Sequence, residues 1–274
     1  MRLETRSGLL SVAALLLSIP AVAQWISYPT AGVPKTANGK PNLNAPAPRT
    51  ADGKPDLSGM WRADFGRVSR PCPTKDCEEV RTSDLWLDFG HGMPGGLPYQ
   101  PWAAEAVKQR KVANGKDDPT SRCLPLGVPR LLVDPEYRKI IQVPGLLVIL
   151  SERNASYRQI FTDGRPLPED PQPSWNGYSS GKWDGDTLVV ESNGFHDGMW
   201  LDRNGSPLTE AARMTERFRR INYGSLEIEV TVNDPKAYTK LWTVKVNEFI
   251  VLNTELLDYI CNENERDLKH LVDK

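Results

Sequence analysis

Ser179 has the spacing of a serine nucleophile. Residues 177–181 fit the pattern G-x-S-x-G, and Ser179 with Lys182 fits S-x-x-K. The first pattern needs a strand before the serine and a helix after it, and the second needs a helix that places the lysine over the serine. Here a proline-rich stretch precedes Ser179, and Asp184-Gly185 predicts a β-hairpin after it. We therefore interpret residues 177–181 as a Gly/Ser turn at the start of a strand.

His196 and its neighbours are the residues best suited to acid–base chemistry. A loop imidazole beside a carboxylate can titrate near neutral pH, which makes His196 with Asp197 the best general-base candidate. Glu191 is a further carboxylate for such a role. Adjacent residues on an extended chain point apart, so the alternative interpretation of His196 is an exposed loop histidine.

The residues that could hold a metal lack the spacing of known sites. Asp197, Asp202 and Asn204 are spaced loosely like the ligands of a calcium loop, but no glutamate stands at the twelfth position. There is no HExxH pattern or close histidine pair for a transition metal. We expect a polar turn at residues 197–206, and neither a metal nor a cofactor.

Aromatic side chains give the strongest indication of a binding site. Five of them lie within 26 residues: Trp175, Tyr178, Trp183, Phe195 and Trp200. On loops at the open end of a barrel, such a group could form the wall of an apolar pocket with a few polar anchors. The alternative is that the same rings pack in the core.

The N-terminus and the composition indicate an exported protein. Arg2 and Arg6 precede an apolar run over residues 9–19, and Ala21-Val22-Ala23 fits the signal-peptidase pattern, so we expect a signal peptide over 1–23. The expected location is periplasmic or extracellular. No later segment is apolar for long enough to cross a membrane. Lys plus Arg number 34 against 35 for Asp plus Glu, which argues against nucleic acid or an anionic membrane as a partner.

The four cysteines favour disulfides in that compartment. Cys72 and Cys77 flank a short polar loop that suits a closed ring, which leaves Cys123 to pair with Cys261. The rival interpretation, a four-thiolate zinc site, usually pairs two CxxC knuckles, and this chain has none.

The elements that must position these residues change character along the chain. Sixteen of the 23 prolines fall between Pro29 and Pro144, which predicts loops and extended chain, with one helix from Pro101 to Ala113. Within this part an octapeptide recurs at residues 36–43 and 50–57, differing only by Asn for Asp. Each copy predicts a tight turn that leads into extended chain.

From Arg138 onward short apolar runs alternate with turn residues, which indicates an antiparallel meander over 138–262. On one strand Leu226, Ile228, Val230 and Val232 alternate with Glu227 and Glu229, and Arg217 and Arg219 on the preceding strand would face these acids across a hairpin. The charged face is either a solvated outer face or a polar lumen. The expected strands are 139–143, 146–153, 156–162, 187–193, 213–221, 225–233, 241–250 and 255–260.

The segment around Gly59 and Trp61 is similar to the Gly-x-Trp opening of lipocalin-like (calycin) barrels, whose tryptophan closes one barrel end. Over almost its whole exported length, the chain also resembles an uncharacterised family of exported bacterial proteins. That resemblance implies a single domain and agrees with a Cys123–Cys261 link, and no catalytic role comes with it. Its motifs are DGKPDLSGMW (52–61), CLPLGVPR (123–130), IFTDGRPLP (160–168), WDGDTLVVES (183–192) and CNEN (261–264).

Together these patterns predict a mainly β protein. We expect a lipocalin-like antiparallel β-barrel or strongly curved meander in a single β-rich domain over 58–274, preceded by an extended arm over 24–57. The leading hypothesis is an exported protein that binds a small, largely apolar or aromatic ligand through the Trp175–Trp200 region. The alternatives are an extracytoplasmic hydrolase, lyase or isomerase that uses His196, Asp197 and Glu191, and an interaction or scaffold protein. The oligomeric state is left open.

Overall fold

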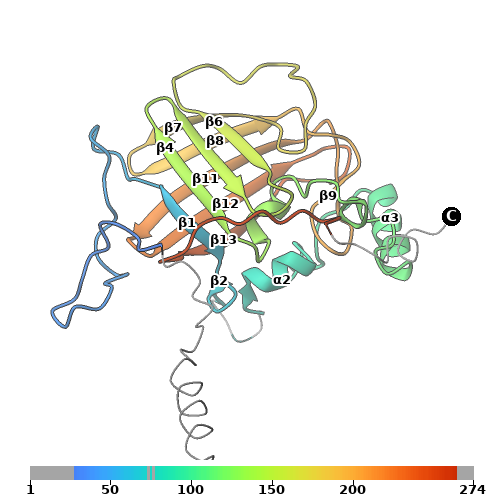
Figure 1. The fold of residues 1–274 in the computed structure, drawn as a ribbon. Coiled ribbons are helices and arrows are strands. Elements are labelled where there is room, and N and C mark those ends of the chain that lie inside the picture. Colours follow the sequence, from blue (N-terminus) through green and yellow to red (C-terminus); the bar gives the residue numbers. More distant parts are fainter. Residues whose placement is uncertain (1–27, 73–74, 76–77, 264–274) are drawn as a thin grey trace, which may run out of the picture.

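The computed structural model describes residues 28–72, 75 and 78–263, so the predicted signal peptide lies outside the described residues. Nine strands form a closed barrel in the order β1-β13-β12-β11-β8-β7-β6-β5-β4, with β4 paired to β1 (Figure 1). The predicted β-barrel is therefore confirmed. The strands are β1 (Gly59–Ala63), β4 (Arg138–Val143), β5 (Leu146–Ser151), β6 (Tyr157–Phe161), β7 (Tyr178–Asp184), β8 (Thr187–Asn193), β11 (Arg213–Asn222), β12 (Ser225–Asn233) and β13 (Trp242–Ile250).

Alternate residues of each strand face the interior, as the period of a half-buried strand requires. On the outside of the β11–β12 hairpin, Arg217 lies opposite Glu229 and Arg219 opposite Glu227. The predicted ladder of charges is therefore present, and it belongs to the outer face, not to a lumen. The predicted inward residues of β12 are all buried: Leu226, Ile228, Val230 and Val232.

Strand β1 closes the barrel, and its position makes one prediction wrong. Trp61 pairs with Ile250 of β13, so the edge of β13 is already occupied by the N-terminal part of the chain. Residues 255–260 were expected to form a strand, but they belong to none of the barrel strands, and Tyr259 forms only an isolated bridge with Arg153.

The meander is antiparallel except at one junction. Residues 162–177 carry the chain from one barrel end back to the other, so β7 runs parallel to β6. The two strands share only the pairs Ile160–Ser179 and Phe161–Ser180.

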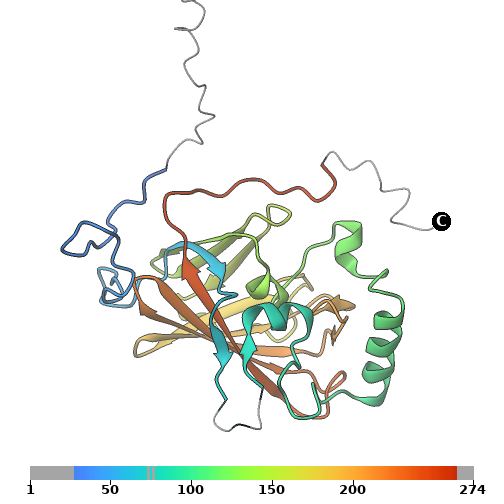
Figure 2. The ribbon, with the colours of Figure 1, turned by 90° about the horizontal axis from the view of Figure 1, so that it is seen from below.

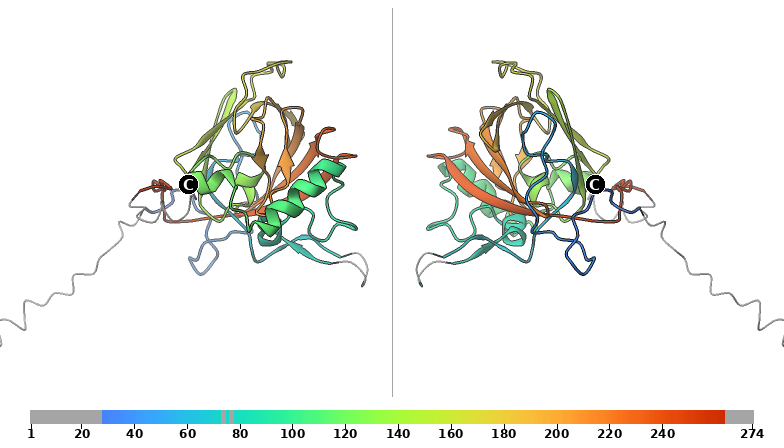
Figure 3. Two further views of the ribbon diagram at one scale, coloured as in Figure 1. Left: turned by 90° about the vertical axis from the view of Figure 1, so that its right-hand side faces the viewer. Right: turned by 90° about the vertical axis from the view of Figure 1, so that its left-hand side faces the viewer.

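The remaining elements cover the barrel end at which β13 begins. The helix predicted from 101 to 113 is α3 (Pro101–Val112), with Ala103 and Val107 buried, and a second short helix, α2 (Thr82–Leu87), was not predicted. The N-terminal arm lies at the opposite end from α3 (Figures 2 and 3). The other short elements are β2 (Val68–Arg70), β3 (Val80–Arg81), η1 (Pro119–Arg122), η2 (Arg130–Val133), β9 (Met199–Trp200) and β10 (Pro207–Leu208).

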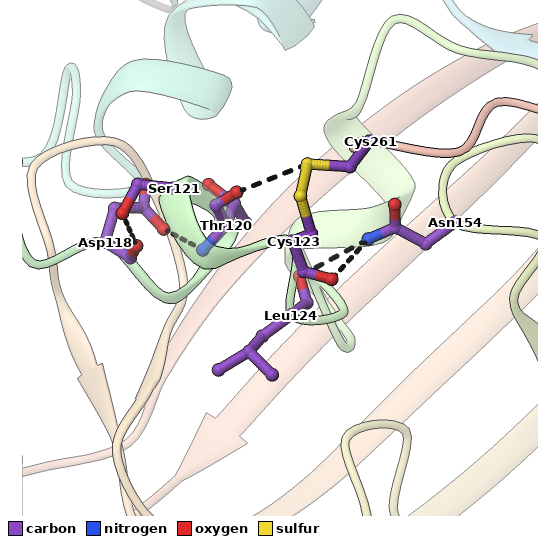
Figure 4. The surroundings of a disulfide bond; sticks show 7 residues. All are labelled: Asp118, Thr120, Ser121, Cys123, Leu124, Asn154 and Cys261. Carbon is purple, nitrogen blue, oxygen red and sulfur yellow. Dashed lines mark hydrogen bonds between the residues drawn. A yellow bond between two sulfur atoms is a disulfide. The ribbon is translucent and has the colours of Figure 1, made fainter. Parts of the chain in front are cut away.

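A disulfide joins Cys123 to Cys261, with the two Cα atoms 5.4 Å apart, so this predicted pair is confirmed (Figure 4). The Asn154 amide donates a hydrogen bond of 3.2 Å to the Cys123 carbonyl oxygen. The disulfide thus ties the C-terminal segment to the chain just after η1. The predicted Cys72–Cys77 pair involves Cys77, which lies outside the described residues.

Two buried ion pairs cross the barrel interior. Arg158 on β6 pairs with Glu216 on β11, and Arg138 on β4 pairs with Glu248 on β13 with an N–O distance of 2.8 Å. All four side chains are at most 1% exposed. Buried charges persist only when they are paired and hydrogen-bonded, so these pairs occupy the middle of the barrel with fixed polar groups.

Candidate functional site

A pocket of about 330 Å³ lies at the barrel end that the N-terminal arm covers. Its wall is built from the β4–β5 turn, the end of β6 and the β7–β8 hairpin, and a turn of the arm closes one side. This volume lies within the range of small-ligand sites, and such sites are common in the mouths of barrels. The lining residues are Thr50, Ala51, Asp52, Gln142, Val143, Pro144, Gly145, Leu147, Thr162, Trp183 and Leu188.

The apolar part of this mouth pocket follows from the strand registers. Trp183 and Leu188 are cross-strand partners on the β7–β8 hairpin, which the Asp184-Gly185 turn predicted correctly. Leu147 points inward from β5 and is 1% exposed, whereas Val143 at the rim is 46% exposed. The pocket therefore has an apolar floor and an open apolar edge.

The arm turn that covers the pocket is the second copy of the sequence repeat. In this hairpin Thr50 N–H donates to the Lys54 carbonyl oxygen at 2.9 Å and Gly53 N–H donates to the Thr50 carbonyl oxygen. Gly53 has φ +80°, a conformation that glycine adopts without strain. The first copy makes the same two bonds at Thr36 and Gly39. One sequence thus forms one hairpin twice, and only the second copy contributes to the pocket.

Two contacts fix the second hairpin on the barrel. The Arg49 guanidinium donates two hydrogen bonds, of 2.9 and 2.6 Å, to the Asp186 carboxylate in the β7–β8 turn, and these bonds hold the pKa of Asp186 below its usual value. On the other side, the Gln142 amide of β4 accepts from Leu57 N–H at 2.8 Å and donates to the Pro55 carbonyl oxygen at 3.2 Å. The cover is therefore held at both of its ends.

Trp61 supports the arm from within the barrel. It is fully buried, and its indole N–H donates to the Leu57 carbonyl oxygen at 3.0 Å. The Arg220 guanidinium lies 4.9 Å from the ring centroid and donates to the Tyr223 carbonyl oxygen at 2.6 Å. Burial lowers the pKa of Arg220 to about 10. This Trp–Arg stack anchors the chain where it enters β1.

The five predicted ligand-binding aromatic residues lie in three different environments. Trp183 lines the mouth pocket. Trp175 and Tyr178 line a more open hollow of about 500 Å³ beside β6, where β6 and β7 diverge. Phe195 is fully buried in the core, and Trp200 is buried with the Arg110 guanidinium 4.7 Å from its ring centroid. The structure does not join them in one pocket, because Tyr178 and Trp183 point to opposite faces of β7 and the other three lie outside β7 and β8.

The predicted acid–base residues are not brought together. The ring of His196 stacks on Trp175 at 4.8 Å between centroids, and its Nδ1 lies 2.7 Å from the Asp197 carbonyl oxygen, not from the carboxylate. Glu191 faces outward from β8 and lines another hollow, next to Arg165. Among the described residues, no hydrogen bond or ion pair joins the His196 ring to a carboxylate oxygen. Their catalytic role stays a prediction.

Ser179 is part of the buried charge cluster. It lies within β7 and is fully buried, and its hydroxyl lies 3.2 Å from Nε of Arg158 and 2.9 Å from the Ser192 hydroxyl. The same arginine pairs with Glu216. Ser179 therefore accepts hydrogen bonds from the buried Arg158 guanidinium, which is a structural role.

The polar turn after His196 is also structural. Asp202 is fully buried and accepts hydrogen bonds from the backbone N–H groups of Phe89 and Ser206, each at 3.0 Å. Burial raises the pKa of this carboxyl. Within residues 28–72, 75 and 78–263, no group of three or more His, Cys, Asp or Glu side chains is placed to hold a metal ion.

Comparison with known proteins adds no family assignment. No protein-family model matches the chain, and no curated protein matches it either. In the part of the chain that the structure describes, none of the helices combines the length and the apolar character that crossing a membrane requires.

Most of the mouth pocket was not identified from the sequence. Of the predicted site residues only Trp183 lines it, whereas Leu147, Thr162 and Asp52 were not singled out as site residues. The repeat marked the two hairpins of the arm, but nothing in its sequence indicated that the second copy would cover a pocket. Strand registers and the path of the arm, which bring these residues together, depend on long-range contacts.

Proposed function

We propose that this protein binds a small, largely apolar ligand in the mouth pocket, beneath the hairpin of residues 49–55. One observation carries the proposal. A cavity of about 330 Å³ lies at an end of a closed β-barrel, and Leu147, Leu188 and Trp183 form its wall. Burial of a ligand against such side chains is favourable by about 25 cal/mol per Å² of apolar surface removed from water.

The cover supports this proposal because polar contacts hold both of its ends, while its tip, residues 51–53, is exposed. Arg49 contacts Asp186 on one side, and Gln142 contacts the backbone of Pro55 and Leu57 on the other. Side chains of Arg49 and Asp186 are 51% and 61% exposed, so the contact exchanges readily with water. The hairpin can thus open to admit a ligand and close over it.

A second part of the proposal concerns location. Disulfides such as Cys123–Cys261 persist in oxidising compartments, which agrees with the signal-peptide pattern of residues 1–23. We propose that the protein acts in the periplasm or outside the cell. Mass spectrometry of the protein from the exported fraction tests this, with Gln24 as the expected first residue. A full-length chain retained in the cytoplasm would contradict it.

Ala51 offers a direct test of the pocket because it lines the cavity from the cover, and Ala37 occupies the same position in the exposed first copy. The neutral dye N-phenyl-1-naphthylamine serves as the probe, and its fluorescence reports entry into an apolar site. We expect saturable binding to the unmodified protein. Ala51→Trp fills the cavity and should weaken binding about tenfold or more, equivalent to ~1.4 kcal/mol. Ala37→Trp should bind as the unmodified protein does.

Two results would contradict the proposal. The first is the absence of saturable dye binding, and the second is equal binding by the Ala51→Trp and Ala37→Trp variants. Circular dichroism of both variants controls for folding, since both substitutions lie on hairpins outside the barrel.

A further inference from the structure

Among the described residues that line the mouth pocket, Asp52 is the one with an ionisable side chain. All the others are apolar, amide, hydroxyl or glycine residues. A carboxylate at the edge of an apolar cavity places a negative charge there that no other lining residue neutralises, although the Lys54 ammonium acts on it from outside the lining. The charge carried by the lining itself therefore comes from one residue of the cover.

The surroundings of Asp52 keep this carboxylate charged. The Thr50 hydroxyl donates a hydrogen bond of 2.5 Å to its Oδ1, and this bond lowers the pKa of Asp52, with a smaller contribution from the positive charge of Lys54. The nearest guanidinium of the cover, that of Arg49, is bound to Asp186 by two hydrogen bonds. Arg49 is thereby directed to the β7–β8 turn, so Asp52 keeps its charge without a guanidinium partner.

Trp183 supplies the second feature that a cation requires. Its indole lines the same cavity, and the face of a tryptophan ring attracts a positive charge, an effect that grows as water is excluded. An anionic ligand would meet repulsion from Asp52 and no compensating cation among the lining residues. The combination of carboxylate, indole and aliphatic wall therefore discriminates by charge.

We propose that the ligand of the mouth pocket is an organic cation, an ammonium group that carries an aryl or alkyl chain. The ammonium group lies against Asp52 and the Trp183 ring, and the apolar chain occupies the floor at Leu147 and Leu188. This inference rests on the proposed binding function and adds the chemical class of the ligand.

The two hairpins provide matched variants for the test. Asp52 in the second copy corresponds to Asn38 in the first, and the Thr36 hydroxyl bonds to the Asn38 amide oxygen as the Thr50 hydroxyl bonds to Asp52. Asp52→Asn therefore removes the charge and gives the second hairpin the asparagine that the first hairpin already carries at this position. Asn38→Asp adds a charge at the exposed copy, away from the pocket, and serves as the control.

The experiment measures competition by three probes of similar size and different charge against N-phenyl-1-naphthylamine. They are phenethylammonium, 2-phenylethanol and phenylacetate at pH 7. We expect the order ammonium, then alcohol, then carboxylate, with about a tenfold advantage of ammonium over alcohol. Asp52→Asn should abolish that advantage, so that ammonium and alcohol bind with about equal affinity to the variant. Asn38→Asp should preserve the order.

The outcomes distinguish a wrong ligand class from a failure of the proposed binding function. If the dye and the alcohol bind and Asp52→Asn leaves the ammonium advantage intact, the ligand class is wrong and the binding function stands. The same holds if phenylacetate binds as well as phenethylammonium. If neither the dye nor any probe binds, as checked by calorimetry, both proposals are overturned.

Discussion

The Arg49 guanidinium lies 2.6 Å from the Asp186 carboxylate, across a separation of 137 residues. This pair joins the N-terminal arm to the β7–β8 turn and closes the mouth pocket on one side. Arginine forms such two-bond contacts with carboxylates because its planar fork matches their geometry. The contact is exposed, so its effect is on the position of the cover and not on the stability of the barrel.

Replacement of Asp186 by Asn should loosen the cover without unfolding the barrel. We expect faster amide hydrogen exchange at residues 50–57, an unchanged rate in β12, and dye binding changed by no more than a few-fold, because an exposed ion pair is screened by water and salt. Asp184→Asn is the matched control, since Asp184 is in the same turn and contacts Arg217 instead. Equal exchange rates at residues 50–57 in both variants would show that the Arg49–Asp186 contact does not hold the cover.

The effect of the Arg49–Asp186 contact on the cover should also depend on pH. The Arg49 hydrogen bonds lower the pKa of Asp186 in the folded protein, so the ionised form favours the closed cover. The stabilisation is complete above the ordinary pKa of an aspartate, about 4, and is lost as the pH falls through the lower folded value. Exchange at residues 50–57, corrected for intrinsic rates, should differ between the unmodified protein and Asp186→Asn at pH 6. The difference should shrink as the pH falls below about 4 towards and through the lowered pKa of Asp186, and a constant difference would disprove this origin.

The buried pair Arg158–Glu216 should show strong coupling in unfolding experiments. Arg158→Met leaves the fully buried Glu216 carboxylate without its guanidinium, which should lower the free energy of unfolding by about 3–5 kcal/mol. The double variant with Glu216→Leu should recover much of this loss, because the Ser179 and Ser192 hydroxyls still bond to each other. Urea denaturation of the unmodified protein, of Arg158→Met, of Glu216→Leu and of the double variant measures the coupling. Additive losses would show that the two charges act independently.

Local sequence patterns were sufficient for most of the barrel strands and their hairpins, but the expected strands did not include β1 or β7. Alternation of apolar and charged residues in β12 determines which face is buried, and Asp184-Gly185 determines a tight turn, because both depend on neighbours in sequence. The same reasoning placed helix α3 to within one residue. It failed for residues 255–260, where an apolar run has strand character but Trp61 already pairs with the edge it would need.

The sequence by itself determined a β-rich chain, its hairpins and the duplicated turn of the arm. Only the tertiary structure decided that β1 closes the barrel, that Trp183 and not Phe195 or Trp200 lines the mouth pocket, and that Asp52 covers it. The physical reason is the range of the interactions. Turns and strand faces follow from residues a few positions apart, whereas the pocket joins Asp52, Leu147 and Trp183 through strand pairing and ion pairs across more than a hundred residues.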